Sequence, residues 1–261
     1  FAVFYIIRYG FVNIYTTMAQ VWKWPWEYVV NFQFINVIGV FIGVFSSAIL
    51  LLKNVSSKVI FIFGFLILAI NAHLISRLFD LDVDTFRVGQ TVFLQGIGQG
   101  WLFTPLVMYI LSAVPPENSA NASMLGASIR FWFTNIGFAF SQNVMYYFQE
   151  KNYDTLKSSI DITRPVVADE VMNKEILYEQ NHINAVIDLL VQNDLMQSVY
   201  AQANLVASKE LFTVYFWFGI FVSVLIALTM PNHAKIKSYL FSFLHKTYTS
   251  FTLLSSLSGS I

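Results

Sequence analysis

Apolar residues gather along the chain in six long runs that are separated by short polar or aromatic connections. Each run holds roughly 20 or more mainly apolar residues, the length that a helix needs to cross the hydrocarbon core of a bilayer. Uninterrupted apolar runs of this length are typical of helices rather than strands. The sequence therefore predicts membrane-spanning helices within residues 1–21, 29–52, 59–79, 88–112, 122–148 and 211–230.

The connections hold residues that end helices or favour the membrane surface. Three tryptophans surround Pro25, and Pro115 and Pro116 form the fourth connection. Tryptophan favours the headgroup level, and proline interrupts a helix. Lys and Arg of short loops are retained on the cytoplasmic side. With the first helix running outward, that side receives more of them: Lys53, Lys58, Lys235, Lys237 and Lys246, against Lys23 and Arg87 outside.

This topology divides the chain into four parts. They are five transmembrane helices in 1–148, an extracytoplasmic loop in 149–210, the last transmembrane helix in 211–231 and a cytoplasmic tail in 232–261. Apolar residues recur at helical spacing between His182 and Val206. They predict an amphipathic helix that either caps the outer mouth of the bundle or packs on the loop. The tail either lies along the inner membrane surface or is disordered.

Composition supports a membrane protein and narrows its chemistry. Hydrophobic residues make up 56% of the chain and charged residues 11%, whereas soluble domains hold roughly 25% charged residues. The formal net charge is zero, so no nucleic-acid partner is expected. The chain has no cysteine, which excludes thiolate metal sites and cysteine nucleophiles. Phe1 lies inside an apolar run without a basic region ahead of it, so we expect a preceding segment rather than a signal peptide.

Three glycines alternate within the fourth run, at Gly96, Gly98 and Gly100. Gly96 and Gly100 have the spacing that lets two membrane helices approach closely. The alternative is a flexing point beside a transport path. A nucleotide-binding loop is excluded, because no strand precedes the glycines and no phosphate-binding lysine follows them.

Many polar residues lie inside the apolar runs. They are Arg8, Asn13, Gln33, Asn36, Asn71, His73, Gln90, Gln95, Gln99, Arg130, Asn135, Gln142 and Asn143. A single buried amide usually forms a hydrogen bond between helices. Together they exceed what such bonds require, so we predict a polar cavity lined by Gln33, Asn36, Gln95 and Asn135. Arg130 is predicted either to anchor its helix at the inner surface or to act in substrate binding or gating.

A further set of residues follows a fixed order along the fourth and fifth runs: Gly96, Gly98, Gly100, Phe103, Pro105, Val114 to Glu117, Ala122, Ser123, Arg130 and Gly137. This order resembles the C-terminal half of the fourteen-helix drug:proton antiporter branch of the major facilitator superfamily. The resemblance implies an all-α, six-helix membrane bundle that forms one half of a transporter. It also implies helix-packing or gating roles for Gly96, Gly98, Gly100, Pro105, Arg130 and Gly137.

The resemblance implies proton-coupled export of amphipathic compounds, including drugs, across the inner membrane. The partners implied are membrane lipids, the N-terminal six- to eight-helix portion of the same transporter, and a periplasmic adaptor with an outer-membrane channel. All Asp and Glu residues lie outside the runs or at their edges, so the coupling acid is expected in that N-terminal portion. No cofactor or metal is expected, because His73 is the only histidine within a run.

Two other function classes stay open. One is a membrane scaffold subunit that transports nothing, since six helices alone lack the partner surface needed for alternating access unless they dimerise. A membrane-embedded, lipid-modifying enzyme would need a catalytic group, and His73 with Asp80 or Asp82 is the nearest approximation in the sequence. We expect no enzymatic activity.

Overall fold

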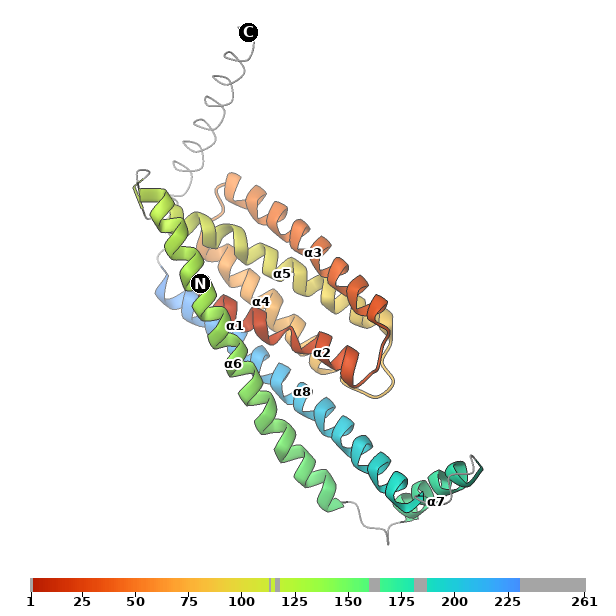
Figure 1. Cartoon of the computed structure of the whole chain (residues 1–261). Coiled ribbons are helices and arrows are strands. Elements are labelled where there is room, and N and C mark those ends of the chain that lie inside the picture. The colour runs from red at the N-terminus through yellow and green to blue at the C-terminus, as the bar shows by residue number, and fades with distance from the viewer. Residues whose placement is uncertain (1, 113, 116–117, 160–164, 181–186, 231–261) are drawn as a thin grey trace, which may run out of the picture.

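The computed structural model describes residues 2–112, 114–115, 118–159, 165–180 and 187–230. Within these ranges the chain forms helices and no strand: α1 (Ala2–Gly10), α2 (Asn13–Gln20), α3 (Trp26–Leu52), α4 (Ser57–Ser76), α5 (Thr85–Ser112), α6 (Ser119–Ser159), α7 (Pro165–Gln180) and α8 (Ile187–Thr229) (Figure 1). The predicted all-α class is thus confirmed for the described residues. Among them, three helices are long and apolar enough to cross a membrane: Trp26–Leu52, Ser57–Ser76 and Leu190–Thr229.

The long helices pack side by side in an order that differs from their order in the chain. α5 lies between α3 and α4, α4 packs on α8, α8 packs on α6, and α6 packs on α1 (Figure 1). The short helix α2 contacts both α3 and α8, and α5 contacts α6. Residues from α1, α2, α3, α5 and α6 therefore face one another across the bundle.

The first apolar run is not one continuous helix as predicted, because it breaks between α1 and α2. Across the break, Val12 N–H donates to Tyr9 O and Tyr15 N–H to Val12 O, both at 3.0 Å, which are tighter three-residue bonds. The Tyr215 ring of α8 lies where a side chain at Gly10 would stand. Glycine is a weak helix former, and here it makes room for that buried ring.

α6 and α8 run far beyond the apolar stretches from which they were predicted. α6 is 41 residues long and continues past 148 to Ser159, whereas α8 is 43 residues long and begins at Ile187. The boundary expected near residue 210 is therefore absent, and much of the predicted loop helix belongs to α8. No proline lies between Ile187 and Thr229, so nothing interrupts the backbone ladder. The predicted tail, 232–261, lies outside the described residues.

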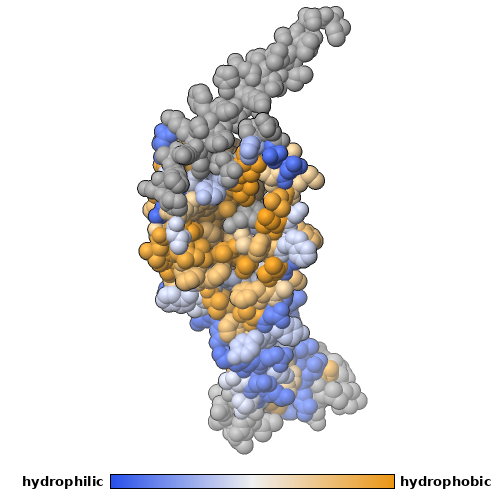
Figure 2. Space-filling model, turned by 90° about the vertical axis from the view of Figure 1, so that its left-hand side faces the viewer, coloured by the Kyte–Doolittle hydropathy of each residue, from blue (hydrophilic) through white to orange (hydrophobic). Residues whose placement is uncertain are grey.

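Apolar side chains cover much of the surface of the bundle. α3 exposes a row of large apolar residues that includes Phe34, Phe41 and Phe45, each 59% or more exposed. Figure 2 shows, on one face of the molecule, an apolar band across the middle and a hydrophilic lower end, where α7 and the ends of α6 and α8 lie in Figure 1. Soluble monomers rarely expose apolar patches of this extent, so a lipid environment accounts for the surface.

Aromatic rings join two of the connections at one end of the apolar band. The Trp22 ring stacks on Phe79 with centroids 6.1 Å apart, and its Nε1 donates to Asp80 O at 2.8 Å. Phe79 in turn packs on Phe212 of α8, with centroids 5.3 Å apart. This aromatic layer holds the α2–α3 and α4–α5 connections against α8 and has the chemistry of a membrane interface.

Candidate functional site

A cavity of about 460 Å³ lies between α1, α2, α3, α5 and α6. Eight of its eleven lining residues carry amide, guanidinium or phenol side chains, in contrast to the apolar residues on the surface of the bundle. The lining residues are Tyr5, Arg8, Tyr9, Val12, Tyr15, Asn36, Gln95, Gln99, Arg130, Phe131 and Thr134. We call it the polar cavity. Its volume is that of a small-molecule site.

Two of the four predicted cavity residues, Asn36 and Gln95, line the polar cavity. The Asn36 Nδ2 donates to Val92 O at 3.1 Å, which fixes the amide of α3 against α5. Gln95 is 3% exposed, and its Oε1 has no hydrogen-bond partner among the described residues. A buried amide oxygen without a partner is costly, and this oxygen is itself closed off from solvent, so its lack of a partner is a cost to folding.

Gln33 and Asn135, the other two predicted residues, do not line the polar cavity. Both are exposed, and the Asn135 Nδ2 donates to Phe131 O of its own helix at 2.9 Å. Asn135 follows Arg130 by five residues, about 140° around the helix, so the two side chains lie on different faces of α6.

Two arginines line the polar cavity, Arg8 from α1 and Arg130 from α6. The Arg130 guanidinium carbon lies 5.8 Å from the centroid of the Tyr5 ring, a cation–π contact. Within the described part of the chain, the ion pairs join Arg87 to Asp84 at 3.9 Å and Lys151 to Glu210 at 3.4 Å. Neither cavity arginine takes part in them.

The glycines of α5 face two different helices. A methyl group added at Gly96 would stand 3.0 Å from the Gly39 Cα, and one at Gly100 would stand 3.0 Å from the Gly43 Cα. One at Gly98 would meet the Leu68 side chain of α4. We call Gly39, Gly43, Gly96 and Gly100 the glycine seam. It brings the α3 and α5 backbones together behind Asn36 and Gln95.

The remaining predicted packing residues lie in similar close contacts. A methyl group at Gly137 would stand 2.7 Å from the Ile6 Cα, so α6 and α1 also approach closely. Pro105 is buried inside α5. Arg130 is the one member of this group that lines the polar cavity.

A second polar cluster joins α2, α6 and α8 without lining the polar cavity. The Tyr215 and Ser141 hydroxyls are 2.5 Å apart, and Asn13 Oδ1 accepts from Gln142 Nε2 at 3.4 Å. Thr17 and Ser208 lie 3.4 Å apart in the same region. These pairs are hydrogen bonds between helices, the usual role of polar side chains within membrane bundles.

The structure does not place His73 beside Asp80. The His73 ring packs on Phe216 of α8, with centroids 5.0 Å apart. The Asp80 carboxylate accepts the Leu81 N–H at 2.8 Å. Among the described residues, no group of three His, Cys, Asp or Glu side chains is arranged to hold a metal ion.

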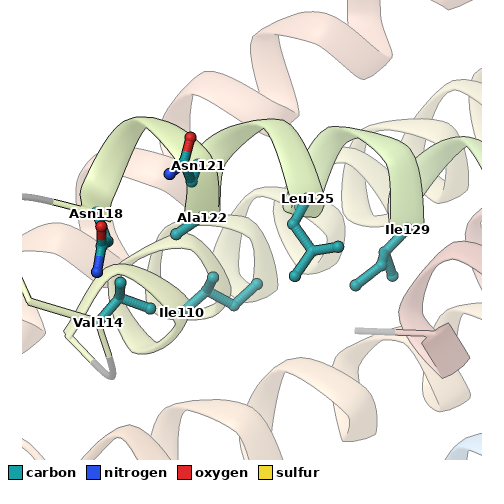
Figure 3. A pocket seen from close by; sticks show the side chains of 8 residues that line it. Ile110, Val114, Asn118, Asn121, Ala122, Leu125 and Ile129 are labelled. Atoms are coloured by element: carbon teal, nitrogen blue, oxygen red, sulfur yellow. The ribbon is translucent and has the colours of Figure 1, made fainter.

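A second cavity, of about 580 Å³, lies where α5 ends and α6 begins. Figure 3 shows that Ile110 and Val114 face Ala122, Leu125 and Ile129 across it, with Asn118 and Asn121 at one end. Its lining is largely apolar and holds no ionisable side chain among the lining residues. It offers packing space and little chemistry.

Sequence reasoning missed several contributors to the site. Tyr5, Tyr9 and Tyr15 line the polar cavity but count as apolar in a membrane run. Their spacing from Arg8 places Tyr5, Arg8 and Tyr9 near one face of a helix, which is a usable signal. Gly39 and Gly43 have the same four-residue spacing as Gly96 and Gly100, so the spacing in the second run could have revealed the seam.

Comparison with known proteins does not extend this description. No protein-family model, curated protein or solved structure matches the chain.

Proposed function

We propose that this chain is one half of a secondary active transporter, with six membrane-spanning helices and a substrate path through the polar cavity. The observation that carries the proposal is that amide and guanidinium side chains from α1, α3, α5 and α6 gather around one cavity that opens between the helices of an apolar bundle. Ionisable residues within membrane helices are costly, and they mark substrate or ion pathways. A scaffold subunit would have no use for such a cavity.

The broken first run supports the same proposal. Tyr9 and Val12 lie on either side of the break between α1 and α2, and Tyr15 follows in α2; all three line the polar cavity. Many transporters bind their substrates beside discontinuous helices, where backbone groups leave the regular ladder. The glycine seam makes α3 and α5 a closely joined pair that can move as one body relative to the broken element.

The resemblance adds a transport direction, export, and a coupling ion, the proton, to the proposal. Proton-driven export of amphipathic compounds across the inner membrane, with the C-terminus in the cytoplasm, fits a cavity that combines polar groups with tyrosine rings. No carboxylate is among the residues that line the cavity, so the proposal places the coupling acid in an N-terminal partner half. A periplasmic adaptor and an outer-membrane channel would complete the export route.

Transport assays with paired variants test this proposal. The complete reading frame is expressed in cells, and efflux of a fluorescent amphipathic dye is followed with and without a protonophore. Asn36→Leu is expected to lower efflux about tenfold, whereas Gln33→Leu, an exposed amide on the same helix, leaves efflux near the wild-type rate. These expectations rest on the loss of one buried polar contact, worth roughly 1–2 kcal/mol.

Membrane insertion of each variant is checked by fluorescence-detected size-exclusion chromatography. Protonophore-sensitive efflux that falls about tenfold in Asn36→Leu and stays near the wild-type rate in Gln33→Leu would support the proposal. Correctly inserted wild-type protein that exports none of the dyes, or equal effects of the two substitutions, would favour the scaffold function instead.

A further inference from the structure

We propose that the polar cavity binds an amphipathic anion, whose negative group lies between Arg8 and Arg130 and whose apolar part packs on the cavity tyrosines. This inference rests on the transporter function proposed above and names the chemical class of its substrate. The negative group is a carboxylate, sulfonate or phosphate.

The charge of the cavity is the first reason. Both Arg8 and Arg130 line it, and no Asp or Glu is among the lining residues. Guanidinium groups stay protonated in proteins. Arg8 is half-buried and Arg130 is exposed, so solvent weakens the repulsion between these two like charges without removing it. An anion between them relieves this repulsion, and a cationic ligand would add to it.

The geometry of the two arginines is the second reason. Tyr5 and Arg8 are three residues apart on α1 and so share a helix face, and the Arg130 guanidinium from α6 lies over the Tyr5 ring. A cation–π contact uses the face of the ring and leaves the guanidinium N–H donors able to bond a ligand. The arginines of two helices thus direct N–H donors into the polar cavity. An oxyanion with two oxygen atoms can accept hydrogen bonds from both.

The opposite wall supplies the third reason. Gln95 of α5 is buried, and its Oε1 is without a partner in the described part of the chain. The Asn36 Nδ2, by contrast, is already occupied by Val92 O. Gln95 and Gln99 of α5 both line this wall, and their amide groups suit a hydroxyl or N–H donor on the ligand. We therefore expect an anion at one end of the ligand, an apolar centre, and a donor group at the other end.

A matched set of probes tests the charge preference. The full-length protein is reconstituted in phosphatidylcholine nanodiscs and titrated by calorimetry with 6-hydroxy-2-naphthoate, with the corresponding neutral naphthyl alcohol, and with the corresponding naphthylmethylammonium ion. The carboxylate is expected to bind about tenfold more tightly than the alcohol, and the ammonium ion is expected to bind more weakly than both. A charge-assisted hydrogen bond supports a difference of this size.

Arginine variants locate the anion. Arg8→Gln and Arg130→Gln are each expected to weaken carboxylate binding about tenfold while changing alcohol binding less than about twofold. Arg130→Lys keeps part of the preference, because it keeps the charge and loses the fork of donors. Arg77→Gln is the matched control, since Arg77 is exposed at the end of α4 and lies outside the cavity.

The same anionic chemistry occurs in solutes and in lipid headgroups, and a second membrane composition separates the two sources. In nanodiscs that contain phosphatidylglycerol, a lipid occupant would weaken apparent naphthoate binding and would stay with the purified wild-type protein but not with Arg8→Gln. A solute site would bind naphthoate equally in both membranes. Either result supports an anion site and identifies its occupant.

Other outcomes overturn the inference. Equal affinity for the three probes, or correctly folded Arg8→Gln and Arg130→Gln variants with unchanged naphthoate binding, would show that the arginines have a structural role. The dye-efflux assay separates the two proposals. Efflux without an anion preference would support the transporter function and contradict the anion site. Anion binding without efflux of any probe would support the anion site and contradict the transporter function.

Discussion

The two sides of α5 face different surroundings, although both belong to one apolar run of the sequence. On the side that faces α3, Gly96 and Gly100 bring two backbones together with no side chain between them. On the side that faces the polar cavity, Gln95 and Gln99 keep polar groups inside the bundle. We expect the first side to lose stability when a side chain is added, and, under the proposed function, the second to lose transport when a polar group is removed. Variants on the two sides should therefore separate folding from transport.

The largest effect is expected in the glycine seam. Gly96→Leu would force a side chain into the Asn36 carbonyl and the Gly39 Cα, and is expected to destabilise the protein by about 3 kcal/mol or to prevent its assembly. Fluorescence-detected size-exclusion chromatography during heating measures the loss. Gly126→Leu is the control, because nothing lies within 4 Å of a methyl group at Gly126. Equal melting of both variants would show that the seam is not close-packed.

The next effect should fall on function alone. Gln95→Leu removes a buried acceptor that has no partner, so it is expected to leave stability unchanged or to raise it by about 1 kcal/mol. Dye efflux should fall about tenfold at the same time, because the polar cavity loses one of its amide groups. Melting and efflux measured on the same preparation check both parts. A stability loss above about 2 kcal/mol would identify Gln95 as a structural residue instead.

A smaller effect is expected where α6 and α8 share hydroxyl groups. Ser141→Ala and Tyr215→Phe each remove one side of the 2.5 Å contact, and a double-mutant cycle should give a coupling of about 0.6 kcal/mol, typical of membrane bundles. Efflux is expected to stay near the wild-type rate, because neither residue lines the polar cavity. A large transport defect in a stable variant would connect this cluster to function.

The smallest effect belongs to the ion pair between Lys151 and Glu210. Their side chains are 53% and 32% exposed, so solvent and salt screen the attraction. Lys151→Met is expected to change the free energy of unfolding by less than about 1 kcal/mol, with the difference shrinking further in high salt. Thermal melting at two ionic strengths measures it, and a salt-independent loss would show that the pair is shielded.

The sequence was a good guide to helices and a partial guide to the cavity. Apolar runs mark helices because length and composition alone decide where a membrane helix is favourable. The same pattern does not tell which side of each helix faces the cavity. It therefore predicts Gln33 and Asn135 as cavity residues together with Asn36 and Gln95. Only the packing of five helices decides which amides face inward.

Two further differences have local causes that the sequence signals only weakly. The break after Gly10 depends on the Tyr215 ring, which is more than 200 residues away in the chain, so no local pattern could place it. The long extensions of α6 and α8 run through polar sequence that reads as a loop beyond the membrane. They stay helical while they lie against each other, held in part by Asn152 and Lys151 on Glu210.

The length of α6 has a mechanical consequence. Ser119 to Ser159 is one uninterrupted helix, with Arg130 in the polar cavity and Lys151 on its outer portion. At 1.5 Å per residue, about 44 Å separate Arg130 from Ser159. A rigid rod of that length that pivots beside Arg130 by about 10° displaces its far end by roughly 8 Å. A small rearrangement around a bound molecule would therefore become a large displacement of the α6 end outside the apolar layer. Conversely, a molecule that binds at this end and shifts it would change the position of the Arg130 guanidinium.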